Sequence, residues 1–277
     1  MKKISIILIY VFLISMLLSA CGESSKDAII VAGSTSIQPY AEMLSEEYSK
    51  LNSEIEVDVQ GGGSSAGIMA VQSGIAHLGM SSRALKDDEL DLWTIEIAKD
   101  GLAIIIHPDN PISDLSIDQV RSIYSGEIKD WGDLSEADGE IYVITREEGS
   151  GTRSAFEEAV MGGKDISSKA IVQNSNGAVR MLVSENKHFI GYISLGLVDI
   201  KGQKAVNALG LDGVAPTWDN VLNGSYSLYR PFLFVSKRKP EEPSQKFIDF
   251  ILSAEGQQIL VNEGLIPSAE GFYNEEF

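Results

Sequence analysis

The chain has 277 residues and a formal net charge of −18, from 22 basic and 40 acidic residues. This length suits one large domain or two modest ones, and 44% hydrophobic residues suffice for a core. Because an acidic surface repels nucleic acid and anionic lipid headgroups, we expect no nucleic-acid partner. An anionic ligand would have to be held by short-range hydrogen bonds in a shielded cleft.

Residues 1–20 have the features of a bacterial export signal. Two lysines precede an apolar run, and small residues precede Cys21. The sequence Leu-Ser-Ala-Cys resembles a bacterial lipobox, which implies that Cys21 is lipidated and becomes the mature N-terminus. The alternative is an ordinary signal peptide followed by an incidental cysteine; the apolar run is short for a membrane span. Residues 21–26 are expected to form a polar tether.

From residue 28 onward the chain alternates between strand and helix patterns. Apolar or alternating runs predict strands, and apolar residues at helical spacing predict helices. We expect strands at 28–32, 55–59, 76–80, 101–107, 140–145, 189–193 and 232–236. We expect helices at 37–51, 68–73, 116–124, 152–160, 176–184, 243–253 and 254–263. This βαβα rhythm predicts an α/β fold with mainly parallel strands.

Four turns rich in glycine or serine follow predicted strands, at residues 33–36, 61–65, 80–83 and 149–152. Ligands of open α/β sheets bind outside the carboxyl ends of strands, so the four turns could converge on one small ligand. The turns offer hydroxyls, and those that open a helix also offer unpaired backbone N–H groups, which bind anions. Arg146 adds a full positive charge just before the last turn. Together these features predict an anion-binding site.

Seven segments carry a resemblance to a known family. They are GSTSI at 33–37, QGGGSSAG at 60–67, SSR at 81–83, NPISDLSIDQVRSIYSGEIKDW at 110–131, REEGSGTR at 146–153, IGYIS at 190–194 and PTWDNVLNGSYSLYRPFLFV at 216–235. These segments resemble the phosphate-binding lipoproteins that serve bacterial phosphate ABC importers. The resemblance extends over nearly the whole chain after Cys21.

The resemblance implies a type II periplasmic binding protein fold, in which two α/β lobes joined by two crossing strands close on the ligand. It also implies an extracytoplasmic lipoprotein, anchored to the cell membrane through Cys21. Such a protein captures inorganic phosphate between its lobes and delivers it to the permease subunits of an ABC importer. We expect it to act as a monomer, without a cofactor or a metal.

Prolines predict where the chain crosses between the lobes. Pro108 and Pro111 follow one predicted strand, and Pro231 precedes another. We therefore expect lobe one to comprise residues 27–107 and 232–277, and lobe two residues 108–231. The first three turns then belong to lobe one and the fourth to lobe two, so an anion held between them would bridge the lobes.

The resemblance assigns phosphate contacts to all four turns and to the arginine. The assigned residues are Ser34, Thr35, Ser36, Ser64, Ser82, Arg146, Ser150, Gly151 and Thr152. Ser65 is a further candidate in the second turn. Glu148 matches an acidic position that in the family orients the arginine, and a carboxylate there would restrict its rotamers. Arg83 and Arg153 either add positive potential or face solvent.

Ser82 departs from the family pattern. In well-known members an aspartate occupies this position and accepts the proton of hydrogen phosphate, which sulfate lacks. A serine hydroxyl can also accept a hydrogen bond, but it carries no charge to repel sulfate. The sequence therefore predicts a weaker preference for phosphate over sulfate than an aspartate would give.

Other functions remain open at this point. Serines in glycine-rich turns can act as nucleophiles, but no histidine is placed beside one, and the G-x-S-x-G elbow is missing from these turns. We therefore expect no enzyme. The scattered histidines and the single cysteine predict no clustered metal site. A binding protein for sulfate or molybdate, or a surface sensor or adhesin that reuses the fold, is the alternative.

Overall fold

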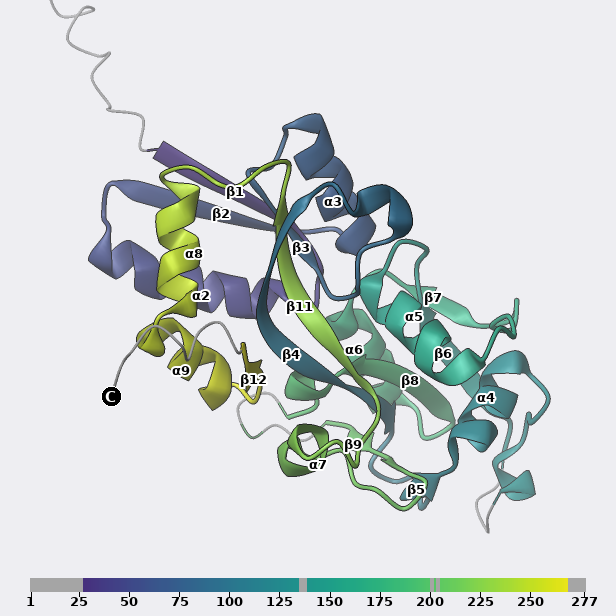
Figure 1. The fold of residues 1–277 in the computed structure, drawn as a ribbon. Coiled ribbons are helices and arrows are strands. Elements are labelled where there is room, and N and C mark those ends of the chain that lie inside the picture. The colour runs from purple at the N-terminus through teal and green to yellow at the C-terminus, as the bar shows by residue number, and fades with distance from the viewer. Residues whose placement is uncertain (1–26, 135–138, 200–201, 203–204, 269–277) are drawn as a thin grey trace, which may run out of the picture.

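The structure is a computed structural model that describes residues 27–134, 139–199, 202 and 205–268. The predicted export signal, the tether and Cys21 therefore lie outside the described residues. Figure 1 shows two groups of helices and strands, joined by a pair of long strands through the centre of the molecule. Within the described residues, no helix combines the length and apolar character needed to span a lipid bilayer.

The first group is built from strand–turn–helix units, as the sequence predicts. β1 (Asp27–Gly33) pairs in parallel with β2 (Ile55–Gly61) and β3 (Leu78–Ser81). α2 (Gln38–Leu51) follows the first turn, and α3 (Ser64–Ser73) follows the second. Because the three strands are parallel, the turns that follow them lie at one edge of the sheet.

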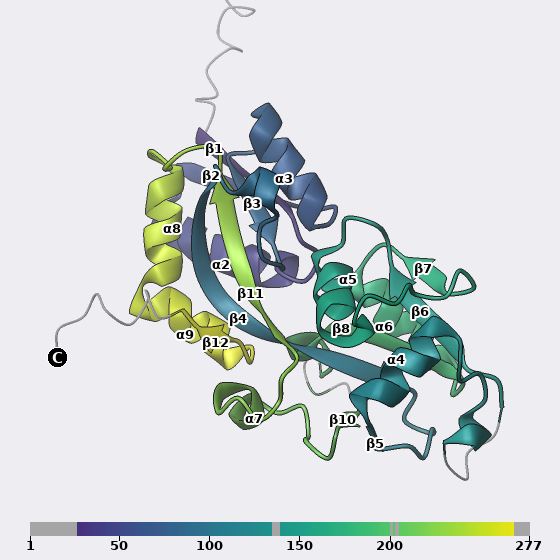
Figure 2. The ribbon, with the colours of Figure 1, turned by 45° about the vertical axis from the view of Figure 1, so that its right-hand side comes forward.

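Two antiparallel strands connect the groups. β4 (Trp93–Ile106) and β11 (Tyr229–Ser236) run side by side, as Figure 2 shows, and β11 lies between β3 and β4 in the sheet. The first part of β4 pairs with β11, whereas residues 102–106 pair with a strand of the second group. The first crossing therefore lies just before Leu102, earlier than the boundary expected after His107.

The second group repeats the strand–turn–helix construction. β6 (Tyr142–Arg146) pairs in parallel with β7 (Ile171–Gln173) and β8 (Phe189–Ser194), and β8 also pairs with β4. α5 (Gly151–Phe156) follows β6, and α6 (Asn176–Glu185) follows β7.

The other helices are α4 (Ile117–Ser125), α7 (Trp218–Leu222), α8 (Ser244–Leu252), α9 (Ala254–Asn262), the π-helix η3 (Glu157–Met161) and the 3-10 helices η1 (Asp87–Glu89), η2 (Trp131–Asp133) and η4 (Leu195–Leu197). The other strands are β5 (Asp114–Leu115), β9 (Asn207–Ala208), β10 (Gly210–Leu211) and β12 (Ile266–Pro267).

The predicted α/β fold class is confirmed, with a mixed sheet. Among the named strands, every antiparallel pairing involves β4 or β11. The strands that precede the four predicted turns, β1, β2, β3 and β6, each have a parallel neighbour. The crossing strands thus account for the departure from a mainly parallel sheet.

Buried apolar side chains form separate cores in the two groups. In these two cores, buried residues up to Ala98 in β4 belong to the first group, and those from Leu102 to Leu228 belong to the second. From Phe232 in β11 onward, buried residues belong to the core of the first group again. We therefore propose a first lobe of residues 27–101 and 229–268 and a second lobe of residues 102–228. These boundaries keep the predicted division of the turns, with three in the first lobe and one in the second.

Candidate anion-binding site

The four predicted turns meet between the two lobes, and their side chains are almost completely buried. Those that expose at most 2% of their surface are Ser34, Ser36, Ser64, Ser82, Arg146, Ser150 and Thr152. Thr35 is half-buried, and the backbone of Gly151 is buried. The structure thus brings all the predicted contact residues to one place.

The first lobe contributes a chain of hydroxyls. The Ser34 hydroxyl donates to Ser82 Oγ at 2.8 Å. The Ser82 backbone N–H donates to Ser64 Oγ at 3.1 Å, and the Ser64 and Ser82 hydroxyl oxygens are 3.4 Å apart. Turns after three different strands are therefore tied together through three serines, which fixes where their hydroxyls lie.

The lobes touch each other directly through these turns. Ser36 Oγ of the first lobe lies 2.9 Å from Thr152 Oγ1 of the second. The Ser65 backbone N–H donates to the Gly149 carbonyl oxygen at 3.0 Å. Arg146 Nη2 donates to Thr35 Oγ1 at 3.1 Å. The structure is therefore in a closed arrangement, in which hydrogen bonds cross from one lobe to the other.

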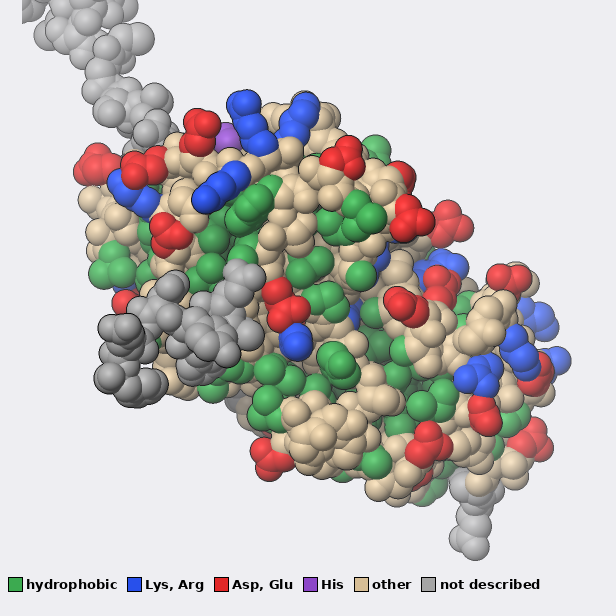
Figure 3. Space-filling model, in the orientation of Figure 1, with side chains coloured by type: hydrophobic (Ala, Val, Ile, Leu, Met, Phe, Trp, Pro, Cys, Tyr) green, Lys and Arg blue, Asp and Glu red, His purple; other side chains and the backbone are tan. Residues whose placement is uncertain are grey.

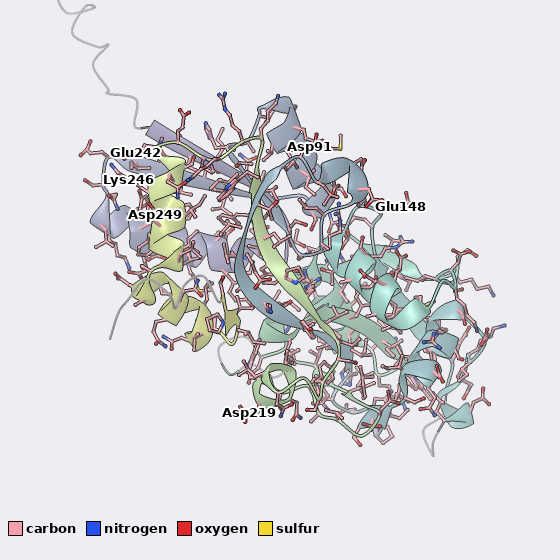
Figure 4. All side chains as sticks on the ribbon, in the orientation of Figure 1. Asp91, Glu148, Asp219, Glu242, Lys246 and Asp249 are labelled. Atoms are coloured by element: carbon pink, nitrogen blue, oxygen red, sulfur yellow. The ribbon has the colours of Figure 1, made fainter. Side chains whose placement is uncertain are left out.

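The carboxylate that orients Arg146 is Glu147, and the prediction of Glu148 in this role is wrong. Arg146 Nε and Nη2 each donate at 2.8 Å to one oxygen of Glu147, in a bidentate pair. Glu148 is exposed and lies at the surface of the loop before α5 (Figure 4). The two glutamates are neighbours in an irregular turn, where sequence spacing does not determine which side chain points toward the arginine.

Ser150 and Gly151 open α5 and serve different purposes. The Ser150 hydroxyl oxygen caps the helix by accepting the Arg153 backbone N–H at 3.3 Å. Gly151 packs against the first lobe, since a Cβ there would lie 2.6 Å from Ser82 Oγ and closer still to Ser64 Oγ. Only a residue without a side chain allows this approach.

Two further polar residues reach the site, and sequence reasoning missed both. Asn176 Nδ2, at the start of α6, donates to Ser36 Oγ at 2.9 Å and to Thr35 Oγ1 at 3.3 Å. Arg230 Nη2, on β11, donates to Ser36 Oγ at 2.9 Å. Asn176 follows a serine at a strand-to-helix turn, which is the construction that marked the other turns. Arg230 precedes Pro231 at the predicted return crossing, where no glycine- or serine-rich turn marks it.

These contacts fix the direction of several hydroxyl protons. Ser36 Oγ accepts from both Asn176 and Arg230, so its two lone pairs are used and its proton points to Thr152 Oγ1. Thr35 Oγ1 accepts from Arg146 and Asn176, which leaves its own proton free to donate. The free Thr35 hydroxyl proton and the nearby guanidinium groups of Arg146 and Arg230 are hydrogen-bond donors, which an oxyanion requires.

The charges around the site favour short-range recognition. Acidic side chains are spread over both lobes on the face shown in Figure 3, so the overall field opposes an approaching anion. Burial raises the pKa of the Asp100 carboxyl beside the site, while the Arg230 guanidinium and the Ser194 hydroxyl oppose that shift. Among the described residues, no group of three or more His, Cys, Asp or Glu side chains could hold a metal ion.

The chain is similar to known proteins over most of its length. The family model described as the PBP superfamily domain matches residues 19–255. The phosphate-binding protein PstS of Pseudomonas aeruginosa PAO1 is 32% identical over 263 residues, which cover 85% of this chain and 81% of that protein.

Two solved structures are also similar. A phosphate ABC transporter substrate-binding protein of Clostridium perfringens with bound phosphate has a TM-score of 0.83 and 40% identity, covering 87% of this chain and 100% of that one. An ABC-type phosphate transport receptor of Vibrio cholerae has a TM-score of 0.71 and 36% identity, with the same coverage of 87% and 100%. The chain therefore belongs to the PBP superfamily and, within it, to the family of the phosphate-binding proteins PstS.

Proposed function

We propose that this chain captures inorganic phosphate between its two lobes and delivers it to the permease subunits of an ABC importer. The observation that carries the proposal is the buried set of hydroxyl, amide and arginine donors contributed by both lobes. Such a set can surround a small oxyanion and hold the lobes together. The similarity to a Clostridium perfringens protein with bound phosphate supports phosphate as that anion.

We propose that the predicted contact residues bind the phosphate, and that Ser150 does so without its side-chain hydroxyl. The residues that supply hydroxyl, guanidinium or backbone N–H donors are Ser34, Thr35, Ser36, Ser64, Ser82, Arg146, Gly151 and Thr152. Ser150 acts through its backbone and through its cap of α5. We propose no catalytic step and no cofactor. His77 Nδ1 accepts the Ile30 backbone N–H, and His107 Nδ1 accepts that of Asp109, so the Nδ1 atom of each of these two rings is not available as a base for a site serine.

Calorimetric titration of the purified full chain with phosphate, sulfate and molybdate tests this function. We expect phosphate to bind most tightly. Tighter binding of sulfate or molybdate would identify a different oxyanion as the ligand. If no oxyanion binds, the surface sensor or adhesin becomes the better explanation, and phosphate uptake in cells that lack the protein would then be unchanged.

Ser82 is the place where selectivity can be changed. Its hydroxyl oxygen is completely buried and accepts from Ser34, so it faces the other site hydroxyls. A Ser82→Asp substitution would add an acceptor that suits the phosphate proton and repels sulfate. Since like-charge juxtaposition costs several kcal/mol, we expect sulfate affinity to fall at least about tenfold while phosphate affinity stays within about threefold.

Competitive titration of both anions at one ionic strength measures this effect. Ser82→Asn is the matched control, because it has the shape of aspartate without the charge. An unchanged phosphate-to-sulfate ratio in Ser82→Asp would show that this side chain does not face the anion.

We further propose that the protein acts outside the cytoplasm as a monomer, held at the cell membrane by a lipid on Cys21. This residue lies outside the described part of the chain, and the support is the lipobox-like sequence that ends at Cys21. A Cys21→Ser substitution is expected to release the protein from the membrane or leave its precursor unprocessed. Membrane fractionation with metabolic labelling by a fatty acid checks this; normal processing and retention of the variant would contradict it.

A further inference from the structure

A buried ion pair lies where the chain crosses between the lobes. Asp100 on β4 and Arg230 on β11 are opposite each other in the antiparallel pairing, and they expose 0% and 2% of their surface. Arg230 Nε and Nη2 donate to Asp100 Oδ2 at 3.2 and 3.0 Å. The Ser194 hydroxyl donates to Asp100 Oδ1 at 2.8 Å. Both carboxylate oxygens are therefore occupied, and the guanidinium is held in one orientation.

The same guanidinium reaches the anion-binding site and has an unused donor. Arg230 Nη2 also donates to Ser36 Oγ at 2.9 Å, at the start of the helix that follows the first turn. Arg230 Nη1 is buried, and no atom of the described residues is its hydrogen-bond partner. A buried charged donor that stays unpaired loses its hydration without compensation, so a partner at this position would be strongly favourable.

Two arginines flank one pair of hydroxyls. On one side, Arg230 Nη2 lies 2.9 Å from Ser36 Oγ. On the other side, Arg146 Nη1 lies 3.4 Å from Thr152 Oγ1. The two hydroxyl oxygens are 2.9 Å apart. The repulsion between these guanidinium groups is one of the causes, after burial, that lower the pKa of Arg230. An anion bound against these hydroxyls would relieve the repulsion and supply the missing acceptor.

We propose that Arg230 is a second anion-binding arginine, whose Nη1 donates directly to an oxygen of the bound phosphate. Asp100 is then a positioning residue that holds the guanidinium at the crossing of the lobes. This inference rests on the proposed function, and it adds to it a contact from the crossing strands. The anion is held by the first lobe, by Arg146 of the second lobe and by Arg230 between them.

The two members of the pair are expected to have opposite effects on binding. Arg230→Gln removes a donor and a positive charge from the anion. Asp100→Asn keeps an acceptor for the guanidinium but removes a negative charge close to the anion. If the pair only supported the fold, both substitutions would weaken binding through the same loss of structure. The sign of the Asp100→Asn effect therefore separates direct binding from structural support.

The experiment is calorimetric titration of inorganic phosphate into the full chain and its variants, with thermal unfolding of each without phosphate. Because the substitution removes a hydrogen bond from a charged donor, Arg230→Gln is expected to lose about tenfold to a hundredfold in affinity. Arg230→Lys should lose less, because lysine keeps the charge but lacks the planar fork. Asp100→Asn should bind phosphate more tightly than the unaltered chain while melting at a lower temperature. The exposed Arg238 provides the control substitution Arg238→Gln, with the same change in charge.

Three outcomes would overturn the proposal. The first is that folded Arg230→Gln binds phosphate with an affinity within about threefold of the control. The second is that Asp100→Asn binds phosphate more weakly than the unaltered chain. The third is that Arg230→Lys and the unaltered chain bind phosphate equally well. If Arg230→Gln does not fold, the double variant Asp100→Asn/Arg230→Gln replaces it, since it leaves no unpaired buried charge. Absence of phosphate binding by the unaltered chain would instead refute the proposed function.

Discussion

Arg146→Ala is expected to weaken phosphate binding by about tenfold to a hundredfold, since hydrogen bonds to charged groups contribute about 1.5–3 kcal/mol and about 1.4 kcal/mol corresponds to tenfold. Arg146 exposes only 1% of its surface, and its Nη groups donate to Thr35 of the first lobe and Thr152 of the second. Removal of the side chain takes away the charge and also frees both hydroxyls from the orientation in which they donate.

Calorimetry of the variant against Arg121→Ala measures this loss. Arg121 lies in the same lobe and donates to the Val160 carbonyl oxygen, so its substitution changes the net charge equally without touching the site. Arg146→Lys separates charge from geometry, because lysine cannot form the bidentate pair with Glu147. A loss below about threefold in Arg146→Ala would show that the REEGSGTR turn is only a helix cap.

Gly151→Ala is expected to weaken phosphate binding by about fivefold to a hundredfold, because overpacking typically costs about 1–3 kcal/mol. The added Cβ would lie 2.6 Å from Ser82 Oγ and closer to Ser64 Oγ, both in the opposite lobe. Rotation of Ser64 would break its hydrogen bond from the Ser82 backbone N–H. The clash arises only when the lobes are closed, so the open protein should remain as stable as before.

Small-angle scattering with and without phosphate tests this explanation directly. The radius of gyration of the unaltered chain is expected to decrease when phosphate binds. At the same degree of phosphate saturation, the radius of gyration of Gly151→Ala should decrease less. Gly177→Ala is the control, since Gly177 is exposed in α6 and a Cβ there meets no close neighbour. Identical scattering changes in both variants would contradict the proposed steric block.

Much of the fold was predictable because strand, turn and helix follow each other in the sequence. Each donor-rich turn was predicted from its glycines, its serines and the apolar strand before it. The first half of β4 was missed because Glu96, Lys99 and Asp100 interrupt its apolar pattern. This half pairs with β11 along its length, and Ala98 and Lys99 also pair with β12, so these polar residues still lie in a strand.

The site was predictable where its residues come from one turn and not where it is assembled from distant segments. The contact of Arg230 with Ser36 joins residues that lie 194 positions apart, and no local pattern indicates it. Asp100 precedes a glycine, a pattern typical of turns, although it lies in a strand and is completely buried. The choice between Glu147 and Glu148 depends on the path of one short loop, which sequence spacing does not determine.

The position of β11 between β3 and β4 has a consequence for the order of folding. Leu233 pairs with Ser81, so the sheet of the first lobe stays incomplete until the C-terminal part of the chain is available. The second lobe is one continuous stretch and can fold earlier. Pairings between such distant residues form slowly, and unpaired strand edges aggregate readily. A chain exported N-terminus first would therefore need protection of β3 and β4 until its last segment has crossed the membrane.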